Sequence, residues 1–457
     1  MFLTVATAAI LTFSPAQQID VLDDRMNAPA PITVDGLDGV CIDINTLEAR
    51  VVFDLDSKTA SVVADLKFRM TGEGGMPIFD LRQDISSATL NGEAIDVAKM
   101  APHDFGKTSG TMRILERELE ASTEHHLKLS YELGTPQSPQ AIPIGWGDGR
   151  LDWDFFFSDL NYGRYMEMWF PANLIYDRFG FEFDMEIKGV KTKHEVVTNA
   201  TVKELGDSHW QLSFPEHYTA FSHMLVVIPA DEVERSTDTI TLPGKKKVTV
   251  DVCVRKNANV KNKKVHKLVE EYMTDFTKST GAWAHGDRCT VFVWTGGRSM
   301  EYDGATTTSM GALSHELHHS WYGRGVKPRG QNDGWFDEAW TVFAADGFRA
   351  GSNVLKSEGR TTTLSPTHLP WNRKTPGKSY AGGATAFHRI ADVIGEKKLL
   401  DLMAQFYDKY KLRTVSTQEM EAFLYEATKE PAVKQVFHRY IYGLDGNWSD
   451  AATSNND

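Results

Sequence analysis

The hydrophobic period of the chain changes once, near residue 256. Between about residues 40 and 255, apolar and polar residues alternate, which predicts strands with one buried face. Turn-rich stretches such as residues 72–75 and Pro243-Gly244 separate these runs, as expected for antiparallel sheets. The clearest alternations are Val62, Ala64, Leu66, Phe68 and Met70; Phe181, Phe183, Met185 and Ile187; and Val248, Val250, Val252 and Val254.

After about residue 258 the apolar residues recur at helical spacing. A single apolar stripe over residues 265–276 predicts an amphipathic helix, and similar stripes cover residues 387–394 and 399–406. Ser416 and Glu419 have the S-x-x-E form of a capping box, which predicts the start of another helix. We therefore predict an α+β protein with a β-rich N-terminal domain over 17–256, a mainly helical domain over 257–450 and a tail over 451–457.

Composition and charge narrow the class of protein. A chain of 457 residues with 41% hydrophobic and 24% charged residues is typical of a globular protein with two or three domains. The formal net charge is -13 and there is no extended basic run, so nucleic acid and anionic membranes are poor candidates for partners. The three cysteines, Cys41, Cys253 and Cys289, lack CxxC spacing, and a disulfide framework is not expected.

The N-terminus resembles a signal peptide. Residues 2–13 are mostly apolar, and Ser14-Pro15-Ala16 places small residues where a signal peptidase cleaves. No lysine or arginine precedes the apolar run, so an N-terminal strand or a ragged tail is the alternative. The prediction is a signal peptide over 1–16 and export to the periplasm or medium; without it the protein would be cytoplasmic. No later segment has the ~18 consecutive apolar residues of a membrane span.

A metal-binding motif stands out at residues 315–319. His315-Glu316-Leu317-His318-His319 is an HExxH pattern, and on a helix residues i and i+4 share one face. His315 and His319 can therefore bind one zinc ion, with Glu316 beside the open coordination position, where a general base must be. About 0.03 such matches are expected by chance, so a polar helix face is the weaker interpretation.

A third ligand is present at a suitable distance. Glu338 follows His319 after eighteen residues, within the segment WFDEAW. The intervening stretch is rich in glycine and proline, which predicts a loop between two helices. Such a loop can return Glu338 to the histidines, and two histidines with one carboxylate leave a fourth position for water.

The combination HELHH, eighteen residues, then a glutamate in WFDEAW resembles the HExxH-x18-E signature of the M1 (gluzincin) aminopeptidases. Upstream, residues 299–302 (SMEY) are similar to the GxMEN strand of that family. Downstream, residues 379–384 (SYAGGA) are similar to its YxKGA segment. The resemblance implies one zinc ion per chain and a thermolysin-like catalytic domain behind a β-rich saddle or sandwich domain.

The resemblance also implies roles for three further residues. Glu301 would bind the α-amine of the substrate, with Met300 contributing to the same substrate-binding strand, and Tyr380 would hydrogen-bond the developing oxyanion. In isolation Glu301 is an ordinary edge-strand carboxylate and Tyr380 a half-buried aromatic residue. Their order and spacing around the zinc motif favour the functional roles.

The chain departs from the family in several places. WFPANLIYDR lacks the aspartate-glutamate-proline part of the xFPCFDEP segment, and Gly382 replaces the lysine of YxKGA. A second amine-binding residue is expected upstream, with Asp159 and Glu167 as candidates. About sixty residues follow the Tyr380 helix, so a short form without the large C-terminal helical domain, and with a more open cleft, is expected. Two other histidine positions are predicted to be structural rather than metal ligands: His318 and residues 124–126 (EHH).

The prediction is a zinc metallo-aminopeptidase that hydrolyses N-terminal residues from peptides. Glu316 would take a proton from a zinc-activated water and pass it to the leaving amine. The alternatives are a zinc hydrolase of another substrate class, such as an endopeptidase or an epoxide hydrolase, and a non-catalytic binding protein with a retained peptidase fold. An intact Glu316 argues against the last. The sequence does not indicate the preferred N-terminal residue or the oligomeric state.

Overall fold

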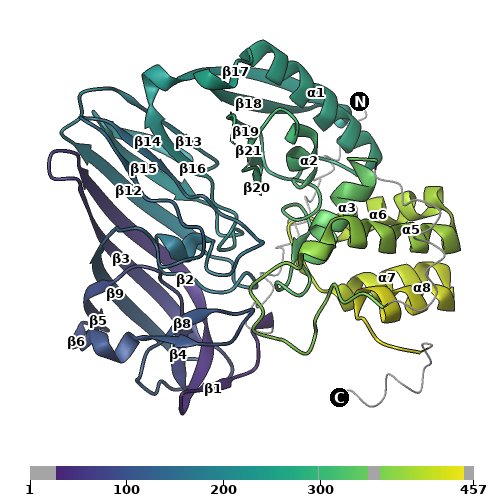
Figure 1. The fold of residues 1–457 in the computed structure, drawn as a ribbon, viewed down its shortest axis with the longest axis horizontal. Coiled ribbons are helices and arrows are strands. Elements are labelled where there is room, and N and C mark those ends of the chain that lie inside the picture. Colours follow the sequence, from purple (N-terminus) through teal and green to yellow (C-terminus); the bar gives the residue numbers. More distant parts are fainter. Residues whose placement is uncertain (1–26, 297, 348–360, 447–457) are drawn as a thin grey trace, which may run out of the picture.

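The computed structural model describes residues 27–296, 298–347 and 361–446, in which a β-rich region is followed by a mixed α/β region (Figure 1). The predicted signal peptide and the predicted tail lie outside the described residues. Among the helices in these ranges, none is long and apolar enough to cross a membrane.

A curled, twelve-stranded sheet forms most of the β-rich region (Figure 1). Its longest strands, β2 (Leu37–Asp54) and β3 (Thr59–Met70), are antiparallel, while β12 (Gly180–Lys188) runs parallel to β2. Every second residue of β3 is buried, which confirms the predicted alternation. The other strands are β1 (Ile32–Val34), β4 (Met76–Phe79), β5 (Ile85–Leu90), β6 (Glu93–Ile95), β7 (Pro102–Asp104), β8 (Thr111–Ile114), β9 (Glu124–Glu132), β14 (Thr201–Gly206) and β15 (His209–Phe214).

A four-stranded sheet shares a core with the large sheet. Trp153 fills the space between them, with its ring centroid 5.0 Å from that of Phe53 and 6.3 Å from that of Phe183. The sandwich that the family resemblance implied is therefore present, because both sheets bury one face in the same apolar cluster. The strands, in spatial order, are β10 (Gly145–Trp146), β11 (Leu151–Asp154), β16 (Leu225–Pro229) and β13 (His194–Thr198).

A five-stranded sheet opens the second region, which is mixed α/β rather than mainly helical. Its strands β18 and β19 are parallel and buried on both faces: Val291 and Val293 face the helical core, while Phe292 packs into the core of the sandwich. Two strands of this sheet precede residue 256, where the period of the sequence changes, and three follow it. The domain boundary at 256/257 remains a prediction. The strands, in spatial order, are β17 (Val233–Leu242), β18 (Lys246–Arg255), β19 (Arg288–Val293), β21 (Ala305–Thr308) and β20 (Met300–Tyr302).

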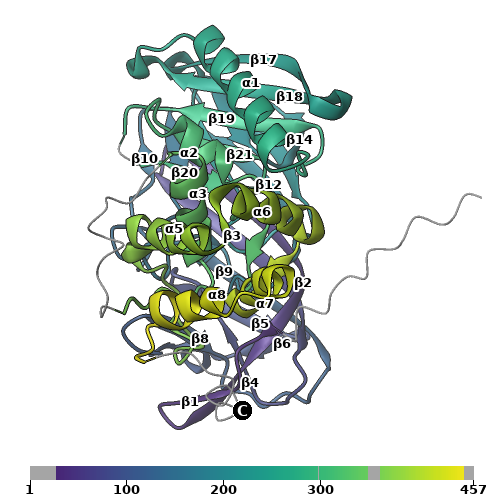
Figure 2. The same ribbon diagram turned by 90° about the vertical axis from the view of Figure 1, so that its right-hand side faces the viewer.

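The helices lie on the face of this sheet that is turned away from the sandwich. Figure 2 shows α1 against the sheet and α5 to α8 below it. The predicted stripe over 265–276 lies in α1, which packs on β17 and β18, and Ser416 and Glu419 form the predicted capping box. Gly383 allows α5 to approach α3 closely, because a Cβ there would overlap that of Ala339. The helices are α1 (Asn262–Ser279), α2 (Leu313–His318), α3 (Trp335–Ala344), α5 (Ala381–Ile394), α6 (Glu396–Tyr410), α7 (Thr417–Thr428) and α8 (Pro431–Val436); short strands β22 (Lys327–Pro328) and β23 (Thr414–Val415) pair between them.

Candidate metal centre

The three predicted zinc ligands meet between α2 and α3. His315 lies on α2 and His319 caps its C-terminal end, with their ring centroids 4.8 Å apart. Glu338, in the first turn of α3, brings its Oε2 to 3.1 Å from His315 Nε2 and 3.6 Å from His319 Nε2. One ligand atom from each residue lies within 4.8 Å of the others, so the group could hold a metal ion.

The donor set fits zinc on two further grounds. His319 Nε2 is buried and has no hydrogen-bond partner among the described residues, a situation that is costly for an imidazole unless it binds something. Two imidazoles and one carboxylate are the ligands of hydrolytic zinc sites, which keep one position open. The geometry of the protein therefore suits a zinc ion at this position.

Two aspartates hold the imidazoles of His315 and His319 by their Nδ1 atoms, on the side turned away from Glu338. Asp346 Oδ2 lies 2.8 Å from His315 Nδ1, and Asp337 Oδ1 hydrogen-bonds His319 Nδ1. These contacts make Nδ1 the donor to an aspartate and turn Nε2 of each ring toward Glu338, where a metal would lie, as in the carboxylate–histidine pairs around zinc. Neither aspartate is among the site residues predicted from the sequence. The position of Asp337 directly before Glu338 is the signal that could have identified it.

The field of these acids favours positive charge at the centre. Burial lowers the pKa of His315, but hydrogen bonds to Asp346 and Glu338 outweigh burial and raise this pKa to about 10. Burial also lowers the pKa of His319, but the charges of Asp337, Glu301 and Glu338 raise it well above the ordinary value. The same negative field would attract a divalent cation.

Gly323 allows Asp337 to reach His319. Its φ of +108° lies in a region that side chains rarely adopt, and a Cβ there would overlap Asp337 Oδ1. The turn after α2 therefore needs glycine both for its backbone and for the space that the carboxylate fills.

Glu316 is buried on the same short helix as His315. Burial, followed by the nearby Glu301 carboxylate, raises the pKa of Glu316 to about 8. A cation at the histidines would favour its ionised form. A carboxyl group whose pKa lies near neutrality is suited to accept and return a proton.

His318, the competing histidine, points away from Glu338. Its Nδ1 lies 2.9 Å from Thr341 Oγ1, and its ring packs edge-on against Phe276 at 4.9 Å. Burial and then the two neighbouring histidines lower its pKa well below the ordinary value, consistent with a neutral core residue. The other decoy, at residues 124–126, lies at the start of β9, where His126 pairs with Asp65.

Tyr380 lies at the edge of the metal centre, where α5 begins. Its hydroxyl donates to Glu338 Oε1 at 2.6 Å, and its ring is parallel to that of His315 with centroids 6.3 Å apart. Burial, with the Glu338 charge second, raises the pKa of Tyr380, so the phenol stays protonated and can donate.

Glu301 faces the metal centre from β20, but it already has a partner. Its Oε1 accepts a hydrogen bond from Arg324 Nη2 at 2.6 Å, and both side chains are buried. Its neighbours Met300 and Tyr302 point to the opposite face and pack into the sandwich core. Substrate binding by Met300 remains a prediction, which its backbone rather than its side chain would have to fulfil.

The structure separates the two candidates for a second amine ligand. Asp159 lies among the acids of the site: burial and then the charges of Glu338, Glu301 and Asp337 raise its pKa well above the ordinary value. Glu167 instead forms a buried ion pair with Arg373 at 2.7 Å, within a contact between the two regions. Asp159 is therefore the candidate that the fold brings to Glu301.

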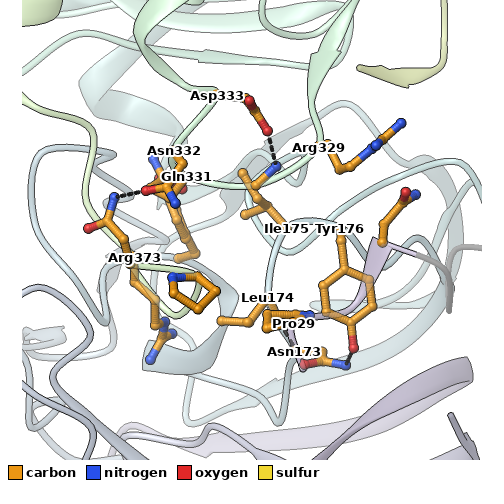
Figure 3. Close-up of a pocket in the computed structure, with 15 residues that line it drawn as sticks. Pro29, Asn173, Leu174, Ile175, Tyr176, Arg329, Gln331, Asn332, Asp333 and Arg373 are labelled. Carbon is orange, nitrogen blue, oxygen red and sulfur yellow. Dashed lines mark hydrogen bonds between the residues drawn. The ribbon is translucent and has the colours of Figure 1, made fainter. Parts of the chain in front are cut away.

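A separate cavity of about 180 Å³ lies where residues 173–176 face loops 329–333 and 370–373 (Figure 3). The ligand set His315, His319 and Glu338 does not line it. Some of its polar groups bond one another: the Asn372 amide donates to Asn332 Oδ1 at 2.9 Å, and the Gly330 N–H donates to Asp333 Oδ2 at 3.2 Å. Two buried polar atoms of its lining residues, Tyr165 Oη and Arg329 Nε, have no hydrogen-bond partner among the described residues.

Comparison with known proteins defines the fold. No protein-family model and no curated protein matches the chain. The structure is similar to that of an M1 zinc metallopeptidase from Deinococcus radiodurans, with a TM-score of 0.63 and 17% identity over 89% of this chain and 95% of that one. A two-domain M1 zinc metallopeptidase variant bound to L-arginine gives a TM-score of 0.62 and 16% identity over 92% and 97% of the two chains.

About half of a longer protein has a similar fold. Legionella pneumophila aminopeptidase A in complex with aspartic acid matches with a TM-score of 0.63 and 12% identity, over 90% of this chain but 50% of that chain. The resemblance inferred from the motifs is thus confirmed at the level of the fold. The chain has the two-domain fold of the M1 zinc metallopeptidases, with a His-His-Glu group placed to hold a metal ion.

Proposed function

We propose that the protein is a zinc aminopeptidase that removes N-terminal residues from peptides. The observation that carries the proposal is the convergence of His315, His319 and Glu338 on one point, with Glu316 on the same helix and Tyr380 in contact with Glu338. An M1 zinc metallopeptidase variant of the same fold, from Deinococcus radiodurans, is bound to a Tyr-Ser-Ala substrate.

The chemistry divides between the metal and the chain. His315, His319 and Glu338 would hold the zinc ion, which would supply Lewis-acid chemistry toward the scissile carbonyl and lower the pKa of a water molecule. Glu316 accepts the proton of that water and returns it to the leaving amine. Tyr380 donates its phenolic hydrogen to the oxygen on which negative charge develops. Glu316 is buried and Tyr380 half-buried, a setting that strengthens these interactions.

Glu301 on β20 and Asp159 would determine which peptide bond of the substrate lies at the metal centre. Glu301 and Asp159 lie beside the candidate zinc ligands, where a pair of carboxylates suits an ammonium group. An α-amine held there places the first peptide bond at the metal centre, so cleavage proceeds one residue at a time.

Free and N-acetylated peptides test this assignment. We expect the purified protein to hydrolyse aminoacyl chromogenic substrates, to lose this activity with a chelator, and to leave N-acetylated analogues essentially uncleaved. Acetylation removes the cation that the carboxylates need, and loss of one partner of a desolvated charge pair costs a few kcal/mol, that is, roughly 10²-fold. Equal rates on free and acetylated peptides would instead indicate an endopeptidase.

Replacing Tyr380 with phenylalanine should lower kcat roughly 10²- to 10³-fold with little change in KM, because the lost hydrogen bond forms mainly in the transition state. Steady-state kinetics on one aminoacyl substrate measures both constants. The Tyr131→Phe variant is a control, because the hydroxyl of Tyr131 bonds the Trp169 carbonyl in the sandwich core. A rise in KM alone for Tyr380→Phe would make Tyr380 a substrate-binding residue.

A further inference from the structure

A buried guanidinium, that of Arg324, lies next to the metal centre. It lies in the turn that follows α2, where its backbone N–H donates to the His319 carbonyl at 2.9 Å. Its side chain is 1% exposed, and Nη2 reaches Glu301 Oε1 at 2.6 Å. The residue predicted to bind the substrate amine is therefore already paired with a cation from its own chain.

Three other contacts hold this guanidinium in place. Nη1 donates to the Gly323 carbonyl at 3.1 Å, Nη2 lies 3.9 Å from Asp337 Oδ2, and the planar group stacks 3.5 Å above the Phe221 ring. Phe221 belongs to the sandwich core, so both regions contribute to the position of Arg324. A guanidinium fixed on several sides imposes its geometry on the carboxylate it binds.

The pairing leaves Glu301 half engaged. Oε1 is bound to Arg324, and Oε2 has no hydrogen-bond partner among the described residues, so Oε2 is the oxygen that an incoming group would meet. Burial of an acid among Asp159, Glu316, Asp337 and Glu338 is unfavourable without a nearby cation. Arg324 supplies that cation while leaving one acceptor for the substrate.

We propose that Arg324 is the positioning residue of the amine site: it orients Glu301 so that Oε2 receives the α-ammonium of the substrate. This inference rests on the proposed aminopeptidase function. The chain Glu301–Arg324–Asp337–His319 also links the amine site to the metal centre, so an effect on the metal is the alternative that the experiment has to separate.

A double-mutant cycle tests the proposal with Arg324→Lys, Glu301→Gln and the combined variant. Lysine keeps the charge but cannot reproduce the planar fork. We expect Arg324→Lys to raise KM for a free aminoacyl anilide roughly tenfold with kcat nearly unchanged, and to have less than about a twofold effect in the Glu301→Gln background, since the two residues act through each other. The zinc content should equal that of the wild type in all three variants.

Arg235 offers a matched control outside the site. Its guanidinium donates two hydrogen bonds to Asp251, with lengths of 3.0 and 2.5 Å. Arg235→Lys should leave KM unchanged. If Arg324→Lys does not fold, the charge-neutral variant with both Glu301→Gln and Arg324→Gln is compared with Glu301→Gln alone. Their KM values should agree within about twofold, because Arg324 has no carboxylate left to orient.

The outcomes separate this inference from the proposed function. A KM increase that persists in the Glu301→Gln background, or a loss of zinc in Arg324→Lys, would overturn the positioning role and assign Arg324 to the metal centre. If Glu301→Gln itself leaves KM for free substrates unchanged and the wild type cleaves acetylated peptides equally, the aminopeptidase assignment fails, whatever Arg324 does.

Discussion

Glu316→Gln is expected to retain zinc and to lose activity by roughly 10²- to 10⁴-fold, the contribution typical of general acid–base catalysis. Glutamine fills the same buried space on α2 but cannot accept a proton. The measurement is kcat/KM on a free aminoacyl substrate, together with elemental analysis of the purified variant.

The control for this variant is Glu419→Gln, which changes a carboxylate that caps α7 and pairs with Arg329 at 2.8 Å. It should lower stability without a comparable loss of rate. If Glu316→Gln remained within a few-fold of the wild type, Glu316 would not be the base, and a different group would have to move the proton.

His319→Ala is expected to lower the metal content from about one zinc per chain to a small fraction of that. Loss of this imidazole removes a ligand, and it also leaves Asp337 without its partner next to Glu301. Even an outer partner of a zinc ligand typically contributes 10- to 100-fold in affinity, so the loss of a direct ligand should exceed that. Activity should fall with the metal.

His318→Ala is the matched comparison, one position away on the chain. Because its Nδ1 bonds Thr341 and its ring packs on Phe276, the variant should lose stability by creating a cavity but keep its zinc. The two thermal transitions with and without added zinc provide a second readout, since a bound metal stabilises only a chain that can bind it. Equal zinc content in both variants would contradict the assigned ligand set.

Much of the local structure could be predicted because it depends on short periods. The two-residue alternation of β3, the apolar stripe of α1 and the capping box of α7 each involve residues within a few positions of one another, and all three are confirmed. The spacing of His315, Glu316 and His319 is equally local. A helix places i and i+4 on one face whatever surrounds it, so the pair of imidazoles could be inferred before any fold was known.

The position of Glu338 could be inferred only through a motif. Its distance from His319 in the sequence does not itself say where the chain returns. The breaker-rich loop predicted a return, and α3 then presents the carboxylate in its first turn. The residue types were therefore enough to predict the three ligands. The distances from Glu338 Oε2 to His315 Nε2 (3.1 Å) and to His319 Nε2 (3.6 Å) depend on how α2 and α3 pack.

The tertiary structure alone decided the rest. It assigned Asp337 and Asp346 to the histidines, paired Arg324 with Glu301, brought Asp159 rather than Glu167 to the site, and extended a sheet across residue 256. These contacts join segments that are far apart in the sequence, so the hydrophobic period and the local spacing of residues cannot predict them. Which carboxylate meets which cation is settled by the packing of the sandwich against the helices, because burial makes each unpaired charge too costly to leave alone.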